Sequence, residues 1–165
     1  MKDKKRISYS KIKTSHSNIL FAVSKQNRLT NFAYDEFIFD DLKIKIFVSV
    51  NEKKINDYFY NIPSAEIKYR LYNLLTIYKT YVAKLELVFS VKVVGGGFFS
   101  QFKSVERAIS NVLFKFIQDS INKEKKEILK SILRKNNLIT VDSRKKERKK
   151  AGKHKARRSK QMSKR

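Results

Sequence analysis

Two segments of the chain have hydrophobic residues at every second position. They are residues 42–50 and residues 84–94, and three glycines directly follow the second one. Because successive side chains of a strand point to opposite faces of a sheet, this alternation predicts two strands that each bury one face. The positions predicted to face the core are Leu42, Ile44, Ile46, Val48 and Val50 in the first segment, and Leu85, Leu87, Phe89, Val91 and Val93 in the second.

Three other segments have hydrophobic residues at spacings of three and four, the pattern of amphipathic helices. They cover residues 64–79, a stretch that begins at residue 100, and residues 122–136. The last of these helices is predicted to turn Ile128, Leu129, Ile132 and Leu133 inward. The order strand, helix, strand, helix, helix predicts the α/β class, in a two-layer α+β form with helices packed on a small mixed sheet.

Length and composition predict one globular body with a basic segment at each end. The chain has 165 residues, of which 41% are hydrophobic, and residues 42–141 are predicted to form the body. Residues 1–41 are predicted to be a basic N-terminal extension or insertion. A targeting sequence is one reading of this segment, but its use of Lys over Arg and its Asp3 favour a solvated or RNA-bound arm.

Several classes of site and location are disfavoured by composition. The chain has no cysteine, which excludes disulfides and thiolate metal sites, and its two histidines, His16 and His154, lie far apart in sequence without clustered acids. We therefore predict no metal, no cofactor and no catalytic histidine. No stretch approaches the roughly 18 apolar residues of a membrane-spanning helix, so no membrane insertion is predicted either.

Residues 142–165, which we call the tail, hold the most concentrated charge. From residue 143 onward there are eight Lys and five Arg against one acid, Glu147, which is +12 of the chain's net +24. Such a segment buries too little surface to order itself, so it is predicted to be extended and to bind a polyanion. Nucleic acid is the favoured polyanion, with a localisation signal or an anionic membrane patch as alternatives. The arginines, which can hold a phosphate with two hydrogen bonds, are the first candidates for fixed contacts: Arg144, Arg148, Arg157, Arg158 and Arg165.

The sequence GGGFFSQ, residues 95–101, joins the second predicted strand to the next helix. It lacks the remaining residues of a phosphate-binding loop or of a dinucleotide fingerprint. One reading is a tight turn whose glycines permit positive φ. The other is a turn where the backbone passes close to an RNA phosphate, with Gln101 and the helix N-terminus supplying N–H donors.

The C-terminal third of the sequence resembles the universal small-subunit ribosomal protein S nine family. That family has a G-G-G-x-x-G-Q turn that enters a helix, then D-x-R-x-x-E-R-K-K-x-G-x-x-K-A-R-R, and a terminus of the form Q-F-S-K-R. The matching stretches here are VVGGGFFSQ, residues 93–101, and DSRKKERKKAGKHKARRSKQMSKR, residues 142–165. Upstream, VNEKKINDYF is similar to the family's V-N-G-x-x-x-x-x-Y-F, so the resemblance covers roughly residues 44–165.

The chain departs from the family pattern at several positions. Glu52 and Ser100 stand where the family has Gly, and Met162 stands where it has Phe. Glu106 and Asn111 stand where it tends to have Arg, which weakens the expectation of an RNA contact from that face of the helix.

The resemblance implies a body similar to the second domain of ribosomal protein S five, bound to the head of the small subunit. It also implies a tail that passes through small-subunit rRNA toward the peptidyl-site tRNA. The partners implied are this rRNA, this tRNA and neighbouring ribosomal proteins, with no small-molecule substrate. The implied rRNA-binding residues are Gly95, Gly96, Gly97, Gln101, Arg144, Lys145, Lys146, Arg148, Lys149, Lys150, Lys153, Lys155, Arg157 and Arg158, and the implied tRNA-binding residues are Ser163, Lys164 and Arg165. Asp142 and Glu147 are expected to be partners for neighbouring tail cations or caps, and not catalytic acids.

The function predicted is that of a non-enzymatic structural protein of the small ribosomal subunit. A free-standing nucleic-acid-compacting protein is the alternative that the charge would also support, and an RNA-processing enzyme is disfavoured by the lack of clustered acids. Frequent Lys, Asn, Ile, Phe and Tyr, with four Gly and one Pro, indicate an AT-rich coding sequence. On this ground we predict a mitochondrial ribosome, with plastid and bacterial ribosomes as alternatives.

Overall fold

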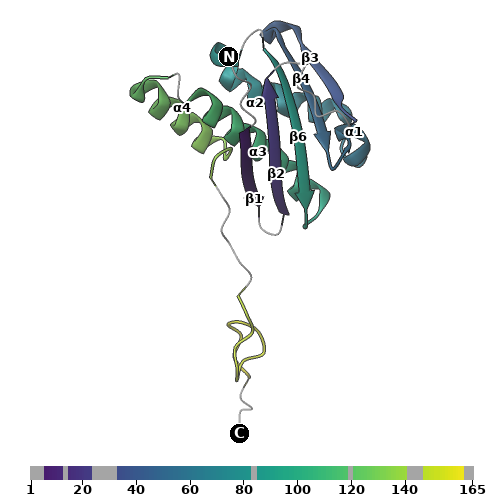
Figure 1. Cartoon of the computed structure of the whole chain (residues 1–165). Coiled ribbons are helices and arrows are strands. Elements are labelled where there is room, and N and C mark those ends of the chain that lie inside the picture. Colours follow the sequence, from purple (N-terminus) through teal and green to yellow (C-terminus); the bar gives the residue numbers. More distant parts are fainter. Residues whose placement is uncertain are drawn as a thin grey trace.

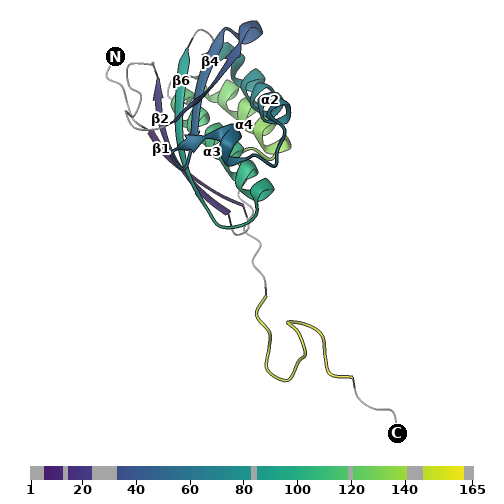
Figure 2. The same ribbon diagram turned by 90° about the vertical axis from the view of Figure 1, so that its right-hand side faces the viewer.

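The computed structural model describes residues 6–12, 15–23, 33–82, 85–118, 121–140 and 147–161. Its helices cover one face of a mixed sheet (Figures 1 and 2). This confirms the expected two-layer arrangement of helices on a sheet. The elements are β1 (Arg6–Ile12), β2 (Ser15–Val23), β3 (Asp35–Phe39), the short helix η2 (Asp40–Leu42), β4 (Ile44–Val50), β5 (Lys53–Lys54), α1 (Ile55–Tyr58), α2 (Ser64–Val82), β6 (Glu86–Val94), α3 (Phe98–Ile117) and α4 (Lys123–Lys135).

The two strands predicted from alternation lie side by side at the centre of the sheet. The strand order is β1-β2-β6-β4-β3, with β5 paired to β4. Strands β4 and β6 run parallel, with Val48 opposite Phe89, and the other pairs are antiparallel. A parallel pair needs a crossover connection, and α2 lies in the chain between the two strands. After β6, the chain continues through the three glycines into α3.

The hydrophobic core lies between this sheet and the helices. The face of β4 and β6 that was predicted to be buried is in contact with α2 and α3. Tyr78 joins the two helices, since its hydroxyl lies 2.9 Å from both the carbonyl and the hydroxyl oxygen of Ser110. Burial raises the pKa of Tyr78 above its usual value, so the hydroxyl stays protonated and can donate in this position. The expectation that each strand buries only one face is too simple, because Phe47 and Val88 form a small cluster with Tyr34.

Three strands precede residue 42, where the body was expected to begin. The hydropathy pattern did not predict β1, β2 or β3, which pair with one another or with the central strands. Ser17 of β2 is fully buried, and its hydroxyl lies 2.9 Å from the carbonyl oxygen and 2.7 Å from the hydroxyl oxygen of Ser104 in α3. Strand β2 of the N-terminal segment is thus packed against α3, the helix that follows the three glycines.

One prediction about the last helix is wrong. Leu129 and Leu133 are buried as expected, but Ile128 is 62% exposed and Ile132 is 39% exposed. Residues one position apart on a helix point about 100° away from each other. Helix α4 buries Leu129 and Leu133, which are four positions apart, and leaves their neighbours Ile128 and Ile132 on a more exposed side.

Candidate nucleic-acid interface

Residues 95–97, which we call the glycine turn, carry the chain from β6 into α3. Gly95 and Gly96 have φ angles of 81° and 72°, which favour glycine. Gly97 has an ordinary φ of −102° and is the N-cap of α3, with no side-chain cap and no acidic residue in the first turn. The expectation of a tight turn with positive φ is therefore confirmed for two of the three glycines.

Gln101 links the glycine turn to Tyr58. Its side-chain nitrogen donates to the carbonyl oxygen of Gly95 at 3.1 Å, and its side-chain oxygen accepts from the hydroxyl of Tyr58 at 3.0 Å. A direct contact of this amide with RNA stays a prediction. What the geometry shows is a residue that positions the glycine turn.

Asn51 fixes the strand that leads into the glycine turn. Its side chain donates to the carbonyl oxygen of Val93 at 3.0 Å and accepts from the N–H of Val93 at 2.8 Å. The pairing of β4 with β6 ends at Val50 and Val91, so the Asn51 amide continues the ladder where β4 has ended. The hydropathy pattern did not single out this residue, although its place in the V-N motif was a signal.

Aromatic side chains surround the glycine turn on its outer side. Tyr60 is 71% exposed and Phe98 is 37% exposed, and their rings stand edge to face with centroids 5.5 Å apart. Beneath them, buried Phe59 makes edge contacts with the rings of Tyr58 and Phe102. A hollow of about 340 Å³ lies beside the exposed pair and the glycine turn. Tyr60 and Phe98 were not predicted as site residues, because the sequence pattern does not show that their rings meet.

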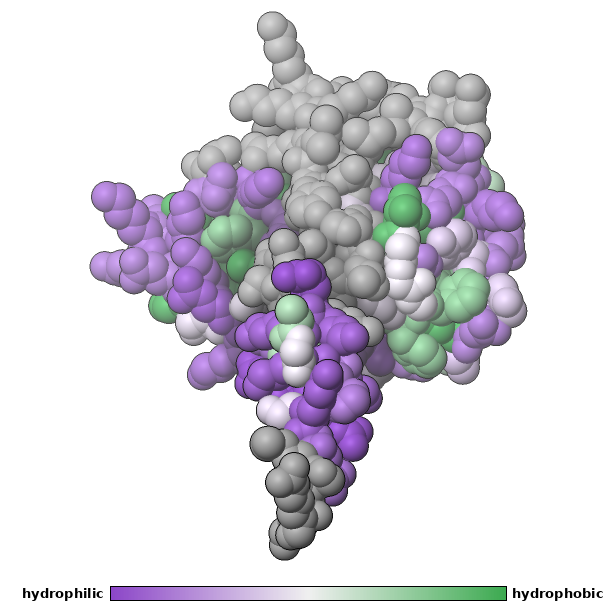
Figure 3. Space-filling view, turned by 90° about the horizontal axis from the view of Figure 1, so that it is seen from below, coloured by the Kyte–Doolittle hydropathy of each residue, from purple (hydrophilic) through white to green (hydrophobic). Residues whose placement is uncertain are grey.

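The described part of the tail, residues 147–161, is almost wholly exposed and hydrophilic (Figure 3). It folds back on itself locally, because Lys153 and Ser159 form an isolated bridge and the N–H of His154 donates to the carbonyl oxygen of Arg158 at 2.9 Å. Gly152, with φ of 74°, lies one residue before this bridge, in a turn where the N–H of Lys153 donates to the carbonyl oxygen of Lys150 at 3.3 Å. Of the cations expected to contact rRNA, this part exposes Arg148, Lys149, Lys150, Lys155, Arg157 and Arg158. Lys153 is half-buried, and its ammonium group donates to the hydroxyl of Ser159 at 3.3 Å.

Arg157 has a partner within the tail. Its Nε and Nη2 atoms each donate to one carboxylate oxygen of Glu147 at 2.9 Å. This hydrogen-bonded contact holds the pKa of Glu147 below its usual value. The expected pairing of Glu147 with a tail cation is therefore confirmed. The other residues predicted to bind RNA or tRNA from the tail lie outside the described residues: Arg144, Lys145, Lys146, Ser163, Lys164 and Arg165, together with Asp142.

Among the described residues, nothing points to metal chemistry or to a membrane span. No cluster of three or more metal-ligating side chains occurs there. The described helices are likewise too short or too polar to cross a bilayer. The features that remain are the glycine turn, its aromatic surroundings and the basic tail.

Comparison with known proteins identifies the family. The model of a family described as ribosomal protein S9/S16 matches residues 42–165, which include the glycine turn and the tail. The chain belongs to the ribosomal protein S9/S16 family. This confirms the expectation of a ribosomal protein rather than an enzyme.

Bacterial members of the ribosomal protein S9/S16 family are similar to the chain. The small ribosomal subunit protein uS9 of Ureaplasma parvum is 37% identical over 118 residues, which cover 72% of this chain and 77% of that protein. The proteins of the same name from Sulfurimonas denitrificans and Borreliella burgdorferi are 48% identical over 73 residues and 44% identical over 75 residues. These two matches cover 44% and 46% of this chain, and the chain spans about half of each relative, 50% and 48%.

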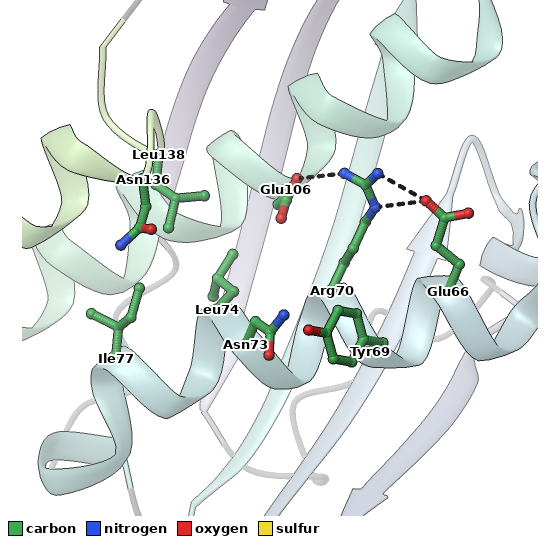
Figure 4. Close-up of a pocket in the computed structure, with 9 residues that line it drawn as sticks. All are labelled: Glu66, Tyr69, Arg70, Asn73, Leu74, Ile77, Glu106, Asn136 and Leu138. Atoms are coloured by element: carbon green, nitrogen blue, oxygen red, sulfur yellow. Dashed lines mark hydrogen bonds and ion pairs between the residues drawn. The ribbon is translucent and has the colours of Figure 1, made fainter.

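Glu106, where the S9/S16 family tends to have Arg, takes part in an internal ion pair. It lies 3.9 Å from the guanidinium of Arg70, which also contacts Glu66 at 2.8 Å (Figure 4). Burial raises the pKa of Glu106, and the nearby cations Arg70, Lys103 and Arg107 oppose this rise. The groove that these residues line, between α2 and α3, therefore carries two acids around one central guanidinium, which does not favour an RNA contact there.

Glu52, where the S9/S16 family has Gly, has a φ of 69°. Because a side chain in this region is strained, we expect Glu52→Gly to stabilise the protein by about 0.5–1 kcal/mol. Urea unfolding measures the change. Glu127→Gly is the matched control, since it removes the same charge from a helical position of α4 and should cost about 1 kcal/mol. Equal destabilisation by both substitutions would contradict the prediction.

Because Glu147 holds the guanidinium of Arg157 through two hydrogen bonds, we expect it to compete with RNA for Arg157. We expect Glu147→Gln to steepen the dependence of rRNA affinity on log salt by about 0.9, the value for one more phosphate neutralised on a duplex. Titrations at several salt concentrations measure this slope. Glu124→Gln changes the net charge equally from an exposed position on α4 and should leave the slope nearly unchanged. The prediction fails if the two variants shift the slope alike.

Proposed function

We propose that the chain is a structural component of the small ribosomal subunit that binds small-subunit rRNA through its tail and the glycine turn. The observation that carries this proposal is the exposed cationic segment within the part of the chain that matches the S9/S16 family. Counterion release by such a segment provides affinity, and a body with fixed loops provides register. No chemical step is required of any residue.

We further propose that Lys164 and Arg165 contact the backbone of the peptidyl-site tRNA, with Ser163 beside them. Support comes from the resemblance to the family terminus and from charge. Two cations at a chain end can hold phosphates without reading bases, which suits a site that accepts every tRNA. Neighbouring proteins of the small-subunit head are the other proposed partners.

The proposal extends to the compartment, which we propose to be a mitochondrial ribosome. The frequent Lys, Asn, Ile, Phe and Tyr, typical of an AT-rich coding sequence, favour a mitochondrial ribosome, while the similar proteins named above are bacterial. Imaging of a tagged chain against mitochondrial and plastid markers would decide between the organelles, and staining spread through the cell body would favour neither.

The experiment that tests the function is sedimentation of a tagged chain in a sucrose gradient at moderate and at high salt. We expect the chain to migrate with the small ribosomal subunit at both. The alternative, a free-standing nucleic-acid-compacting protein, is supported by the net charge of +24. It predicts sedimentation with bulk DNA, which would overturn the ribosomal proposal, as would recovery of the chain at the top of the gradient.

A further inference from the structure

The outer side of the glycine turn has features that its role as a connection does not explain. Tyr60 and Phe98, which we call the aromatic pair, are 71% and 37% exposed, although Phe59 and Phe102 on the same two segments are buried in the core. Tyr60 follows α1 and Phe98 begins α3, so two separate elements hold the rings in fixed relation. An exposed aromatic pair on a rigid support is a surface suited to a planar ligand.

Gly97 supports the same conclusion from the backbone. Its φ of −102° is open to any residue, and a Cβ atom added there would meet nothing within 4 Å. Neither conformation nor packing in the structure therefore requires glycine at this position. A glycine that lines a hollow and is not needed by the fold leaves room for a ligand close to the backbone.

The charges around the hollow distinguish between a base and a phosphate. Lys53 and Asp57 both line it, and both are exposed. A carboxylate repels a phosphate but accepts hydrogen bonds from the amino groups of nucleobases. A nucleotide with its base against the aromatic pair and its phosphate toward Lys53 satisfies both charges. The volume of about 340 Å³ lies at the lower end of the range for small-ligand sites.

We propose that the aromatic pair and the hollow beside Gly97 form a stacking site for one unpaired base of RNA. The inference rests on the proposed function, because it assumes that RNA is the partner of the glycine turn. It adds a specific contact that depends on ring surface, whereas the tail contacts depend on charge. Single-stranded RNA is commonly recognised by stacking its bases on aromatic side chains.

The test uses the full-length chain and a short single-stranded RNA that carries one fluorescent aminopurine base. Titrations are run at raised salt, so that the tail contributes less to binding. We expect quenching of the aminopurine on binding, and we expect Tyr60→Leu and Phe98→Leu each to lower affinity roughly 5- to 100-fold with the salt slope unchanged. Gly97→Ala should lower affinity without changing the midpoint of thermal unfolding.

Tyr69→Leu is the matched control, because Tyr69 is 64% exposed on α2 and does not line this hollow. It should bind like the unchanged chain. The stacking site would be overturned if the Tyr60 and Phe98 variants bound the RNA with unchanged affinity. It would also be overturned if these variants no longer associated with the small subunit but still bound the RNA normally. The proposed function fails in a different way, if the unchanged chain does not sediment with the small subunit.

Discussion

Truncation before residue 143 is expected to lower the affinity of the chain for small-subunit rRNA by roughly 10³-fold or more at about 0.1 M salt. The deleted segment carries +12 of the net +24, and in its described part nearly every residue is exposed. Each phosphate that it neutralises adds about 0.9 to the salt slope on a duplex, so about ten contacts would contribute a slope near nine. Filter-binding or anisotropy titrations at several salt concentrations measure both quantities.

Paired charge substitutions test whether RNA affinity depends on the cations of the tail or on the net charge of the whole chain. Lys149 and Lys150 lie in the tail, and Lys123 and Lys125 lie at the start of α4, and all four are exposed. Changing either pair to Gln removes two positive charges. We expect the tail pair to lower the salt slope by about 1.8 and the α4 pair to change it much less. Equal slopes for the two double variants would mean that the tail is only one basic surface among others.

The central layer could be predicted from the sequence because its residues bury large, regularly spaced side chains. Alternation identified β4 and β6, and the three- and four-residue spacing identified α2, α3 and α4. Strands β1 and β2 were missed because polar and hydroxyl residues, such as those around Ser17, interrupt any period of two. Strand β2 is placed in the sheet by its pairing with β6, and β1 by its pairing with β2, and a hydropathy pattern along one segment does not contain that information.

The candidate site could be predicted only in part for a similar reason. The glycines at positive φ and the charge of the tail are properties of short stretches, and a sequence displays them directly. The contacts of Gln101 with Gly95 and Tyr58 join residues 6 and 43 positions apart. The aromatic pair likewise joins α3 to the segment after α1, and its exposure depends on which neighbouring rings fill the core. Such pairs become visible only when the elements are placed in three dimensions.

Asn51→Ala is expected to lower the free energy of unfolding by about 2–4 kcal/mol, because it leaves the N–H and the carbonyl of Val93 without their side-chain partners. Val93 is 3% exposed, so water replaces the lost bonds poorly. Alanine also fits the φ of 48° at this position less well than asparagine does. Urea unfolding of the full-length chain measures the loss.

Asn51→Gly separates the two contributions to this loss. Glycine adopts positive φ without strain but lacks the amide, so we expect it to recover about 1 kcal/mol relative to alanine and no more. Full recovery by glycine would show that backbone conformation, and not the amide, fixes the end of β6. Because Val93 lies two residues before Gly95, loss of the amide should also weaken RNA binding at the glycine turn. The salt slope should stay unchanged in both variants, since the tail keeps all its charges.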